Sequence, residues 1–294
     1  LTHVVFIPLI VIGGIGFPVL DNLRSVLMHR LSRRRRVLGG WDRDHVNLEG
    51  ARLTLHTKVV LTTTAGLYLF GVVAIATSQL MPYVHDHFNH GTTANARELP
   101  PLSAGVVGGT LADASFTSVT SRTAGFNTMP MAELERQGAG QFVVMLLMVV
   151  GGSSGGTAGG VKTTTFAVLV LGIVATVRQR RHAEAFGRRI ADSLVFKAGT
   201  LGLCYLGVIA SATFLLLLSE SAPMSRLLFE VVSATTVTGL SLGVTADLTS
   251  FGKTVIIACM FLGRIGPLEL LAALMIGLGR DRPYTYPHVG VVIA

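Results

Sequence analysis

Charged residues are scarce in this sequence. Only 14% of its 294 residues are charged, against about 25% in a typical soluble domain. Half of the residues are hydrophobic, and the mean hydropathy is +0.60. Several apolar stretches approach or exceed the roughly 20 residues that cross a bilayer as a helix. This composition excludes an ordinary water-soluble domain and predicts an all-α polytopic membrane protein.

Clusters of side chains that would indicate a metal site or a catalytic site are also rare. Cys204 and Cys259 both lie in apolar runs, where cysteine behaves as a small hydrophobic residue. His85, His87 and His90 are a candidate metal site, but an exposed polar loop is favoured because no second ligand cluster accompanies them. No Ser-His-Asp set with supporting context is recognisable. The net charge of +8 does not predict nucleic-acid binding, because the basic residues lie between hydrophobic segments.

Five hydrophobic segments are candidate spans, near 4–28, 59–81, 141–177, 194–218 and 254–278. No secretory signal peptide is recognisable, and the chain opens at Leu1 in an apolar stretch, so we expect it to be the later part of a longer chain.

The connections between these spans alternate in charge. Segments 29–58 and 178–193 and the C-terminal tail are rich in arginine and lysine, whereas 82–140 and 219–253 are poor in them. The positive-inside rule therefore places the first three in the cytoplasm. The run Arg33–Arg36 is explained by this topology signal, and binding of anionic lipid remains an alternative.

The two outer connections share a design. Each holds a short apolar segment that ends in a glycine turn, "FTSVTSRTAGFNT" in the first and "FEVVSATTVTGLSLGVT" in the second, and Gly125 aligns with Gly239. The unit helix, re-entrant short helix with loop, helix is thus predicted twice. Irregular backbone at membrane depth must be buried in protein or line a wet cavity, where its carbonyls can replace the hydration shell of a cation. An ordinary extracellular hairpin with a glycine turn is the alternative.

Several motifs together carry a resemblance to a known family. "SVTSRTAGFNT", "GGTAGGVKTTT", "FEVVSATTVTGLSLGVT" and "MFLGRIGPLEL" occur in order, with "IGGIGFPVL" before them and "YTYPHVGVVIA" after them. The sequence resembles the Trk/Ktr/HKT superfamily of potassium transporters, and most of all the Ktr-type membrane subunit. The resemblance implies four helix–pore–helix repeats around a central pore. It identifies this chain with the last helix of the second repeat, the third repeat and the fourth.

The resemblance also implies a division of the chain. The expected segments are a closing transmembrane helix of an earlier repeat (1–30), a basic cytoplasmic loop (31–56), the third repeat with a broken second helix (57–180), the fourth repeat (181–280) and a cytoplasmic tail (281–294). The first repeat and the filter strand of the second are expected to lie outside this sequence.

By the same resemblance, backbone carbonyls form a selectivity filter for K⁺. The filter residues are Arg122, Thr123, Ala124, Gly125, Thr236, Val237, Thr238 and Gly239. Thr123, Gly125, Val237 and Gly239 are the expected K⁺ ligands, and Gly125 and Gly239 the sharpest candidates. One departure is that Thr235 and Thr236 stand where relatives tend to have an aromatic residue and a glycine, which puts the packing behind the filter in doubt.

The stretch "GGSSGGTAGGVKTTT" looks at first like a phosphate-binding loop. Val161 separates Gly160 from Lys162, and apolar segments flank the motif, so both the spacing and the context of a nucleotide site are missing. Close packing of helices through small residues is a second interpretation. So many glycines would break the span, however, and in the family such a segment is an intramembrane gate. The gate residues are Gly151, Gly152, Ser153, Ser154, Gly155, Gly156, Thr157, Gly159 and Gly160, with Lys162 and Arg264 beside them.

Four charged side chains have predicted roles of their own. Lys162 and Arg264 lie deepest in the predicted spans, where charges are functional hypotheses by default. Arg264 is expected to hold the closed gate and repel cations, although a snorkelling or helix-paired arginine is an alternative, and Lys162 can instead snorkel to the cytoplasm. Pro267 is expected to kink the last helix. Asp113 and Glu230 are expected near the starts of the short pore helices, where carboxylates favour the helix dipole.

The predicted function is K⁺ uptake across the cell membrane by a multi-pass protein that is no enzyme. The only expected cofactor is K⁺ itself, with Na⁺ as a candidate activating ion. The resemblance implies contact with membrane lipid, a homodimer, and a cytosolic RCK/KTN-type ring that carries the regulatory nucleotide. An ATP-dependent pump that uses the Gly-Lys motif and a non-transporting membrane scaffold are the alternatives.

Overall fold

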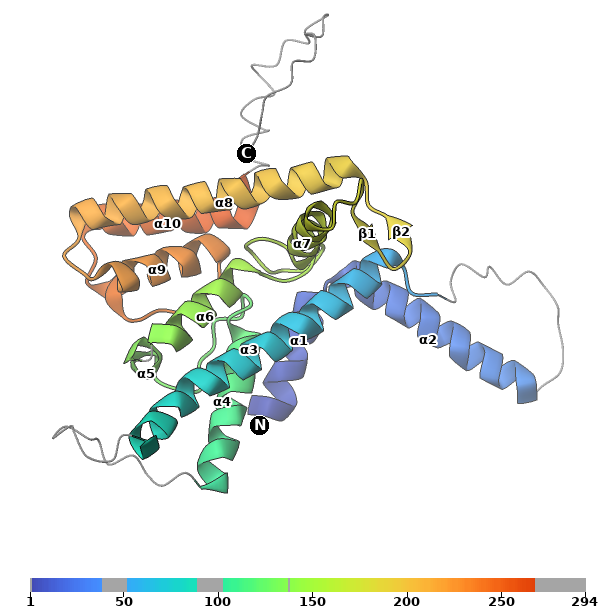
Figure 1. Cartoon of the computed structure of the whole chain (residues 1–294), viewed down its shortest axis with the longest axis horizontal. Helices are drawn as coiled ribbons and strands as arrows, with labels where there is room; N and C mark the ends of the chain where they lie inside the picture. Colours follow the sequence, from blue (N-terminus) through green and yellow to red (C-terminus); the bar gives the residue numbers. More distant parts are fainter. Residues whose placement is uncertain (1, 39–51, 89–102, 137, 268–294) are drawn as a thin grey trace, which may run out of the picture.

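The structure is a computed structural model that describes residues 2–38, 52–88, 103–136 and 138–267. It is mostly helical, as Figure 1 shows. In chain order its elements are the π-helix η1 (Thr2–Phe6), α1 (Ile7–Ile15), α2 (Phe17–Leu38), α3 (Leu55–Phe88), α4 (Ala104–Thr120), α5 (Met131–Arg136), α6 (Gly138–Val149), α7 (Thr163–Val177), β1 (Glu184–Ala185), β2 (Arg188–Arg189), α8 (Asp192–Ser219), α9 (Met224–Thr236), the short 3₁₀ helix η3 (Val244–Ala246) and α10 (Ser250–Ile265).

Two of the described helices are long and apolar enough to cross a membrane, namely α3 over Leu55–Met81 and α8. Large apolar side chains stand on their outer surfaces. Val73 on α3 is 62% exposed, and Leu203 on α8 is 71% exposed. Exposed apolar residues along both helices would be unfavourable in water. These surfaces therefore fit the predicted helical membrane protein.

The first predicted span, 4–28, is not one continuous helix, which corrects the expectation of a single closing helix. α1 and α2 meet at Gly16 with a bend of 100°. Gly16 has a φ of +85°, which glycine adopts without strain, and Pro18 sits in the first turn of α2. The Phe17 N–H does not continue the helix ladder but donates to the Gly155 carbonyl at 3.3 Å. α2 also extends to Leu38, into the segment expected to be a loop.

Two further predicted spans are also not continuous helices. α6 ends at Val149 and α7 begins at Thr163, so the glycine-rich stretch between them is not helical. α10 ends at Ile265, where Gly266 has a φ of +98° and precedes Pro267. The interruption thus replaces the kink expected at Pro267. Residues 268–278 of this span and the tail 281–294 lie outside the described residues, as does His90.

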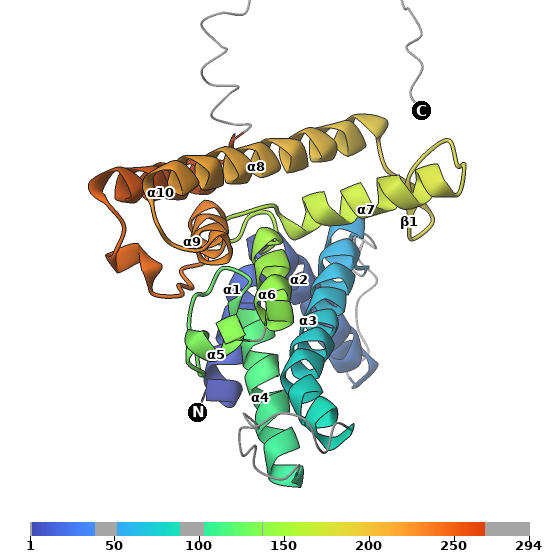
Figure 2. The same cartoon turned by 60° about the vertical axis from the view of Figure 1, so that its left-hand side comes forward.

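The helices pack in two groups that share one apolar core. In Figure 2, α9 lies beside α8 and α10, whereas α4 lies alongside α3 with α6 next to both. Buried side chains from both groups form a continuous cluster that includes Ile75, Leu147, Leu216 and Phe229. The C-terminal halves of the short helices α4 and α9 are therefore buried, whereas the first half of α4 is largely exposed. Gln141 on α6 joins the groups by donating to the Ser225 carbonyl at 3.1 Å.

Candidate ion filter and gate

The two glycine turns expected to form the filter have matching backbones. After α4, φ is positive at Thr123 (70°) and at Gly125 (79°). After α9, it is positive at Val237 (56°) and at Gly239 (93°). The left-handed region is uncommon for threonine and strained for β-branched valine. The two turns thus share positive φ values at aligned positions.

Backbone amides in these loops bond back to the short helix that precedes them. The Ala124 and Gly125 N–H groups both donate to the Thr120 carbonyl, at 3.0 and 3.2 Å. The Thr238 N–H donates to the Ser233 carbonyl at 2.9 Å, and the Gly239 N–H to the Ser233 hydroxyl at 3.2 Å. In the part of the chain that the structure describes, no backbone N–H donates to the carbonyls of residues 122–125 or 236–239. Carbonyls without an amide partner are what a cation ligand set requires.

The two loops also meet each other. A Cβ atom added to Gly125 would overlap the carbonyl oxygen of Thr238, and one added to Gly239 would stand 3.8 Å from the Gly125 Cα. The four predicted K⁺ ligands, Thr123, Gly125, Val237 and Gly239, thus lie on two adjoining turns, although aligned positions of the two turns are 114 positions apart in the sequence.

The glycine-rich segment between α6 and α7 is a closed loop rather than an open connection. Its two ends are joined because the Gly151 N–H donates to the Val161 carbonyl at 2.9 Å and the Thr163 N–H to the Gly152 carbonyl at 3.0 Å. The Ser154 hydroxyl of the loop and the Thr164 hydroxyl in the first turn of α7 share a hydrogen bond of 2.9 Å. The loop therefore has a fixed base and a distinct tip.

This loop lies directly against the second filter turn. A Cβ atom on Gly159 would stand 2.5 Å from the Thr236 carbonyl oxygen and 2.9 Å from the Val237 side chain. Only glycine allows the backbone to come so close. The first filter turn is also near, because the Thr123 methyl group is 3.3 Å from the equivalent position at Gly151.

The opposite side of the loop rests on the bend between α1 and α2. The Ser153 N–H donates to the Gly14 carbonyl at 2.7 Å, and the Gly155 carbonyl accepts from the Phe17 N–H. A Cβ atom on Gly156 would be 3.1 Å from the Gly13 carbonyl oxygen. Each break in a helix thus supplies hydrogen-bond partners for the other, as non-helical backbone within a membrane requires.

The two charges expected beside the gate both bind its backbone. Arg264, near the end of α10, donates from Nη1 to the Thr157 carbonyl at 2.5 Å. Lys162, the residue before α7, donates from Nζ to the Ala158 carbonyl. Lys162 therefore folds back onto the loop instead of reaching along α7. A cavity of about 160 Å³ separates these two cations and is also lined by Thr165 and Tyr205.

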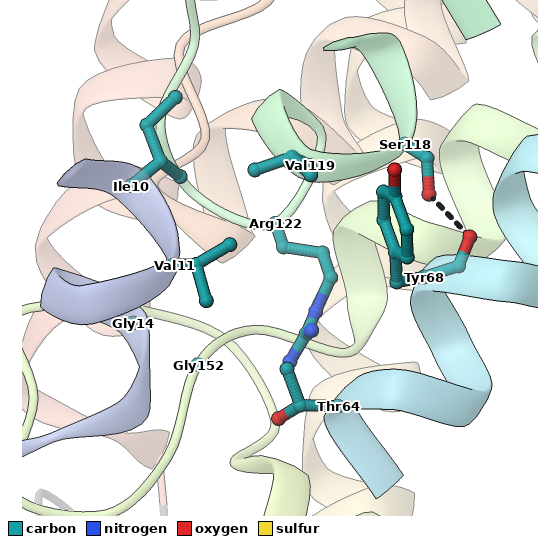
Figure 3. A pocket seen from close by; sticks show the side chains of 9 residues that line it. All are labelled: Ile10, Val11, Gly14, Thr64, Tyr68, Ser118, Val119, Arg122 and Gly152. Atoms are coloured by element: carbon teal, nitrogen blue, oxygen red, sulfur yellow. Dashed lines mark hydrogen bonds between the residues drawn. The ribbon is translucent and has the colours of Figure 1, made fainter. Parts of the chain in front are cut away.

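Arg122 has a role that the sequence did not indicate. Figure 3 shows its side chain leaving the filter turn in the direction of Thr64, with Val11 and Tyr68 among its neighbours. Its Nη2 donates to the Gly151 carbonyl at 3.2 Å, whereas its Nε is buried without a partner in the described part of the chain. The adjoining cavity of about 30 Å³ has room for about one water molecule. A filter residue is thereby attached to the base of the glycine-rich loop.

The acidic residues on the short helices are not near the helix starts, which corrects that expectation. Glu230 lies in the middle of α9 and Asp113 in the second half of α4. Glu230 is buried and accepts hydrogen bonds from the Ser241 hydroxyl at 2.7 Å and the Leu242 N–H at 2.9 Å. Asp113 accepts from the Thr128 hydroxyl at 3.0 Å. Both carboxylates thus tie down the chain just after a filter turn.

The departure at Thr235 and Thr236 is accommodated on two sides of α9. The Thr236 hydroxyl bonds the Val232 carbonyl and the Thr238 hydroxyl, each at 2.8 Å. The Thr235 backbone packs against Gly263 of α10, where a Cβ atom would overlap the Thr235 carbonyl. A cavity of about 200 Å³ remains beside the turn, lined in part by Ser233, Gly239 and Met260.

Comparison with known proteins gives a consistent result. A family model described as "TrkH: Cation transport protein" matches residues 1–282. The potassium/sodium uptake protein NtpJ of Enterococcus hirae is 32% identical over 290 residues, which are 97% of this chain and 55% of that protein. The Ktr system potassium uptake protein B of Bacillus subtilis is 32% identical over 263 residues, 90% of this chain and 50% of that protein.

A solved structure has the same fold. The potassium transporter TrkH from Vibrio parahaemolyticus superimposes with a TM-score of 0.62 at 16% identity, over 93% of this chain and 52% of that one. The chain therefore spans about half the length of the relatives that it matches.

Proposed function

This chain belongs to the TrkH family of cation transport proteins, and we propose that it forms part of the pore of a membrane protein that takes up K⁺. The family consists of transporters and not enzymes, so the chain is not an ATP-dependent enzyme. Its relatives are named as potassium or potassium/sodium uptake proteins, which supports K⁺ as the transported ion.

The observation that carries this proposal is the matched pair of turns. Their amides bond back to α4 and α9, and their carbonyls have no backbone amide partner in the described residues. We place K⁺ at the carbonyls of Thr123, Gly125, Val237 and Gly239. The short helices contribute the partly negative dipole of their C-terminal ends at the same place. Na⁺ is a candidate activating ion in this proposal.

The glycine-rich loop is the proposed gate of this pathway. Its returning segment, at Gly159, lies against Thr236 and Val237 and so obstructs the approach to the second filter turn. Arg264 holds the tip through the Thr157 carbonyl, and its charge repels cations below the filter. Glycine suits a segment that changes its backbone conformation when the pathway opens.

The proposed topology follows the two repeats. Residues 57–180 and 181–280 each form a helix–pore–helix unit, after the bent pair α1–α2, which ends an earlier unit. The basic segments 31–56 and 178–193 and the tail 281–294 face the cytoplasm of a cell membrane protein. We further propose a homodimer whose cytoplasmic faces dock on an RCK/KTN-type ring, which binds the regulatory nucleotide. The name "Ktr system" of two relatives supports an assembly of several components.

The decisive experiment measures K⁺ uptake by the full-length protein in a host that lacks its own K⁺ uptake systems. Gly239→Ser should abolish uptake or its preference for K⁺ over Na⁺, because Gly239 has a φ of +93° at the proposed ion site. Gly243→Ser is the matched control. Gly243 has a φ of +88° and open space around it, but it lies beyond the filter turn.

Equal losses in the two variants would assign the effect to backbone strain and not to the filter. Unchanged uptake and unchanged ion preference in Gly239→Ser would refute the filter and favour a non-transporting scaffold.

A further inference from the structure

The largest cavity among those described has no proposed filter residue in its lining, and it shares Thr165 and Leu201 with the cavity beside Lys162 and Arg264. It has a volume of about 470 Å³, within the range of roughly 300–1,000 Å³ typical of small-molecule sites. Its walls are the first turns of α3, the start of α7, the end of the β1–β2 hairpin and the start of α8. None of the proposed filter or gate residues lines it.

The inner wall of this cavity is apolar. On α8, the lining residues Leu194, Lys197, Ala198 and Leu201 follow the helical repeat and so share one face. Leu55 and Val59 on α3 and Val168 on α7 complete the apolar wall. Thr164 and Thr165 also line the cavity, but its wall is mostly apolar and fits a hydrocarbon chain.

The mouth of the cavity carries two cations. Lys197 is exposed, and no ion pair is found for it in the described part of the chain. Arg189 pairs with Asp192 at 2.8 Å through Nη2, and the rest of its donor fork is available. One further polar atom lies deeper, because His56 Nε2 is buried without a hydrogen-bond partner in the described residues.

The surroundings of the cavity indicate a membrane surface. The segments that enclose it adjoin the two basic connections assigned to the cytoplasm, and exposed apolar side chains flank it. Phe196 is 78% exposed and Leu194 is 50% exposed. The cytoplasmic leaflet is rich in anionic lipids, each of which combines an acyl chain with a negative headgroup.

We propose that this cavity binds an anionic phospholipid. One acyl chain fills the apolar cavity, the phosphate lies between Lys197 and Arg189, and His56 Nε2 hydrogen-bonds an ester oxygen of the lipid. The proposal rests on the cytoplasmic assignment made under the proposed function. A bound lipid would fasten α7, which follows the gate loop, to α3 and α8.

The test measures binding of phosphatidylglycerol and of phosphatidylcholine to the purified full-length protein by native mass spectrometry. The wild-type protein should retain phosphatidylglycerol in preference to phosphatidylcholine. The double variant Arg189→Gln/Lys197→Gln should bind it roughly thirty-fold more weakly, because each basic residue near the surface adds to the attraction. Arg178→Gln/Arg181→Gln is the matched control, since it removes the same charge from the same connection outside the cavity.

A second pair of variants tests the cavity itself. Ala198→Leu and Val168→Phe fill the apolar wall and should weaken lipid retention while leaving both cations in place. Retention unchanged in both would overturn the acyl-chain site. If the control double variant lost phosphatidylglycerol to the same extent, the effect would be one of diffuse positive charge and not of this cavity. If inorganic phosphate stabilised the wild-type protein as much as the lipid does, the site would be one for a free anion.

The outcomes are separable from those for the proposed function. Gly239→Ser should lose K⁺ uptake and keep the bound lipid. Loss of the lipid preference with normal K⁺ uptake would leave the filter proposal intact. Loss of K⁺ uptake with a normal lipid preference would leave the proposed lipid site intact.

Discussion

The Arg122 guanidinium, which belongs to the first filter turn, donates from Nη2 to the Gly151 carbonyl at the base of the glycine-rich loop, across 3.2 Å. The same loop is bound at its tip by Arg264 through Thr157. Two arginines from different helical groups thus hold opposite ends of one loop. Because Arg122 also belongs to the proposed filter, we expect a movement of the loop base to be transmitted to the filter turn.

Replacement of Arg122 by methionine should raise the basal K⁺ flux. The variant removes a hydrogen bond from a charged donor, which is typically worth about 1.5–3 kcal/mol, and so favours the open loop roughly tenfold or more. The flux is measured with purified full-length protein in liposomes. Arg122→Lys keeps the charge without the forked donor and should have an intermediate effect. A normal flux in a stable Arg122→Met protein would contradict the coupling.

Deletion of Ser153 to Gly159 should also raise the flux. The base of the loop is already closed by the Gly151–Val161 hydrogen bond, so the deletion removes the tip together with Gly159, which lies against Thr236, while leaving α6 and α7 joined. Arg264→Gln should act in the same direction, because it removes the charged donor that holds the tip. A deletion variant that folds and conducts like the wild type would rule out the gate.

Replacement of Gly263 by alanine should destabilise the protein strongly. A Cβ atom there would overlap the Thr235 carbonyl, and overpacking of this kind costs about 1–3 kcal/mol or more. Gly199→Ala is the matched control, since Gly199 lies within α8 with nothing within 4 Å of the added atom. That variant should be neutral or gain up to about 1 kcal/mol from helix propensity. Thermal unfolding in detergent compares the two variants, and equal shifts of the unfolding temperature would contradict the close packing of α9 on α10.

Acid should weaken the contact between Glu220, at the C-terminal end of α8, and Thr249, at the start of α10. A hydrogen bond from the Thr249 hydroxyl, at 2.5 Å, lowers the pKa of the Glu220 carboxyl below its usual value. A carboxyl whose pKa is lower in the folded state stabilises the protein above its unfolded pKa of about 4.3, and that contribution is lost as the pH falls through the folded pKa. Thermal unfolding followed from pH 6 downward should therefore show a smaller acid loss in Glu220→Gln than in the wild type.

Thr249→Val provides the second arm of this experiment. It removes the hydroxyl donor and should also reduce the acid dependence of stability. The substitution leaves the backbone N–H at this position, which also donates to Glu220 in the wild-type structure. An unchanged acid dependence in both variants would show that Glu220 does not contribute.

The family and the helical membrane architecture were predictable from the sequence, because both depend on local patterns. The motifs around Gly125 and Gly239 carry the resemblance, which the comparisons confirm. The low charge and the apolar runs predicted membrane-crossing helices, and α3 and α8 have the expected length. The assignment of filter and gate residues stays a prediction for the experiments above.

Other features could not be read from the pattern of residues. The 100° bend at Gly16 depends on hydrogen bonds to Ser153 and Gly155, which are distant in the sequence. Glu230 was assigned to a helix start, but α9 begins earlier and its carboxylate binds the chain beyond the filter turn. The lipid-sized cavity joins the starts of α3, α7 and α8 and has no local signature at all.

The sequence by itself determined where helices can cross a membrane and where glycine must interrupt them, because hydrophobic length and backbone freedom are properties of short segments. Only the tertiary structure decided which interrupted backbones satisfy each other. Gly14 meets Ser153, Arg122 meets Gly151 and Arg264 meets Thr157 because buried polar groups outside helices need partners, and the packing of the helices decides which ones are within reach.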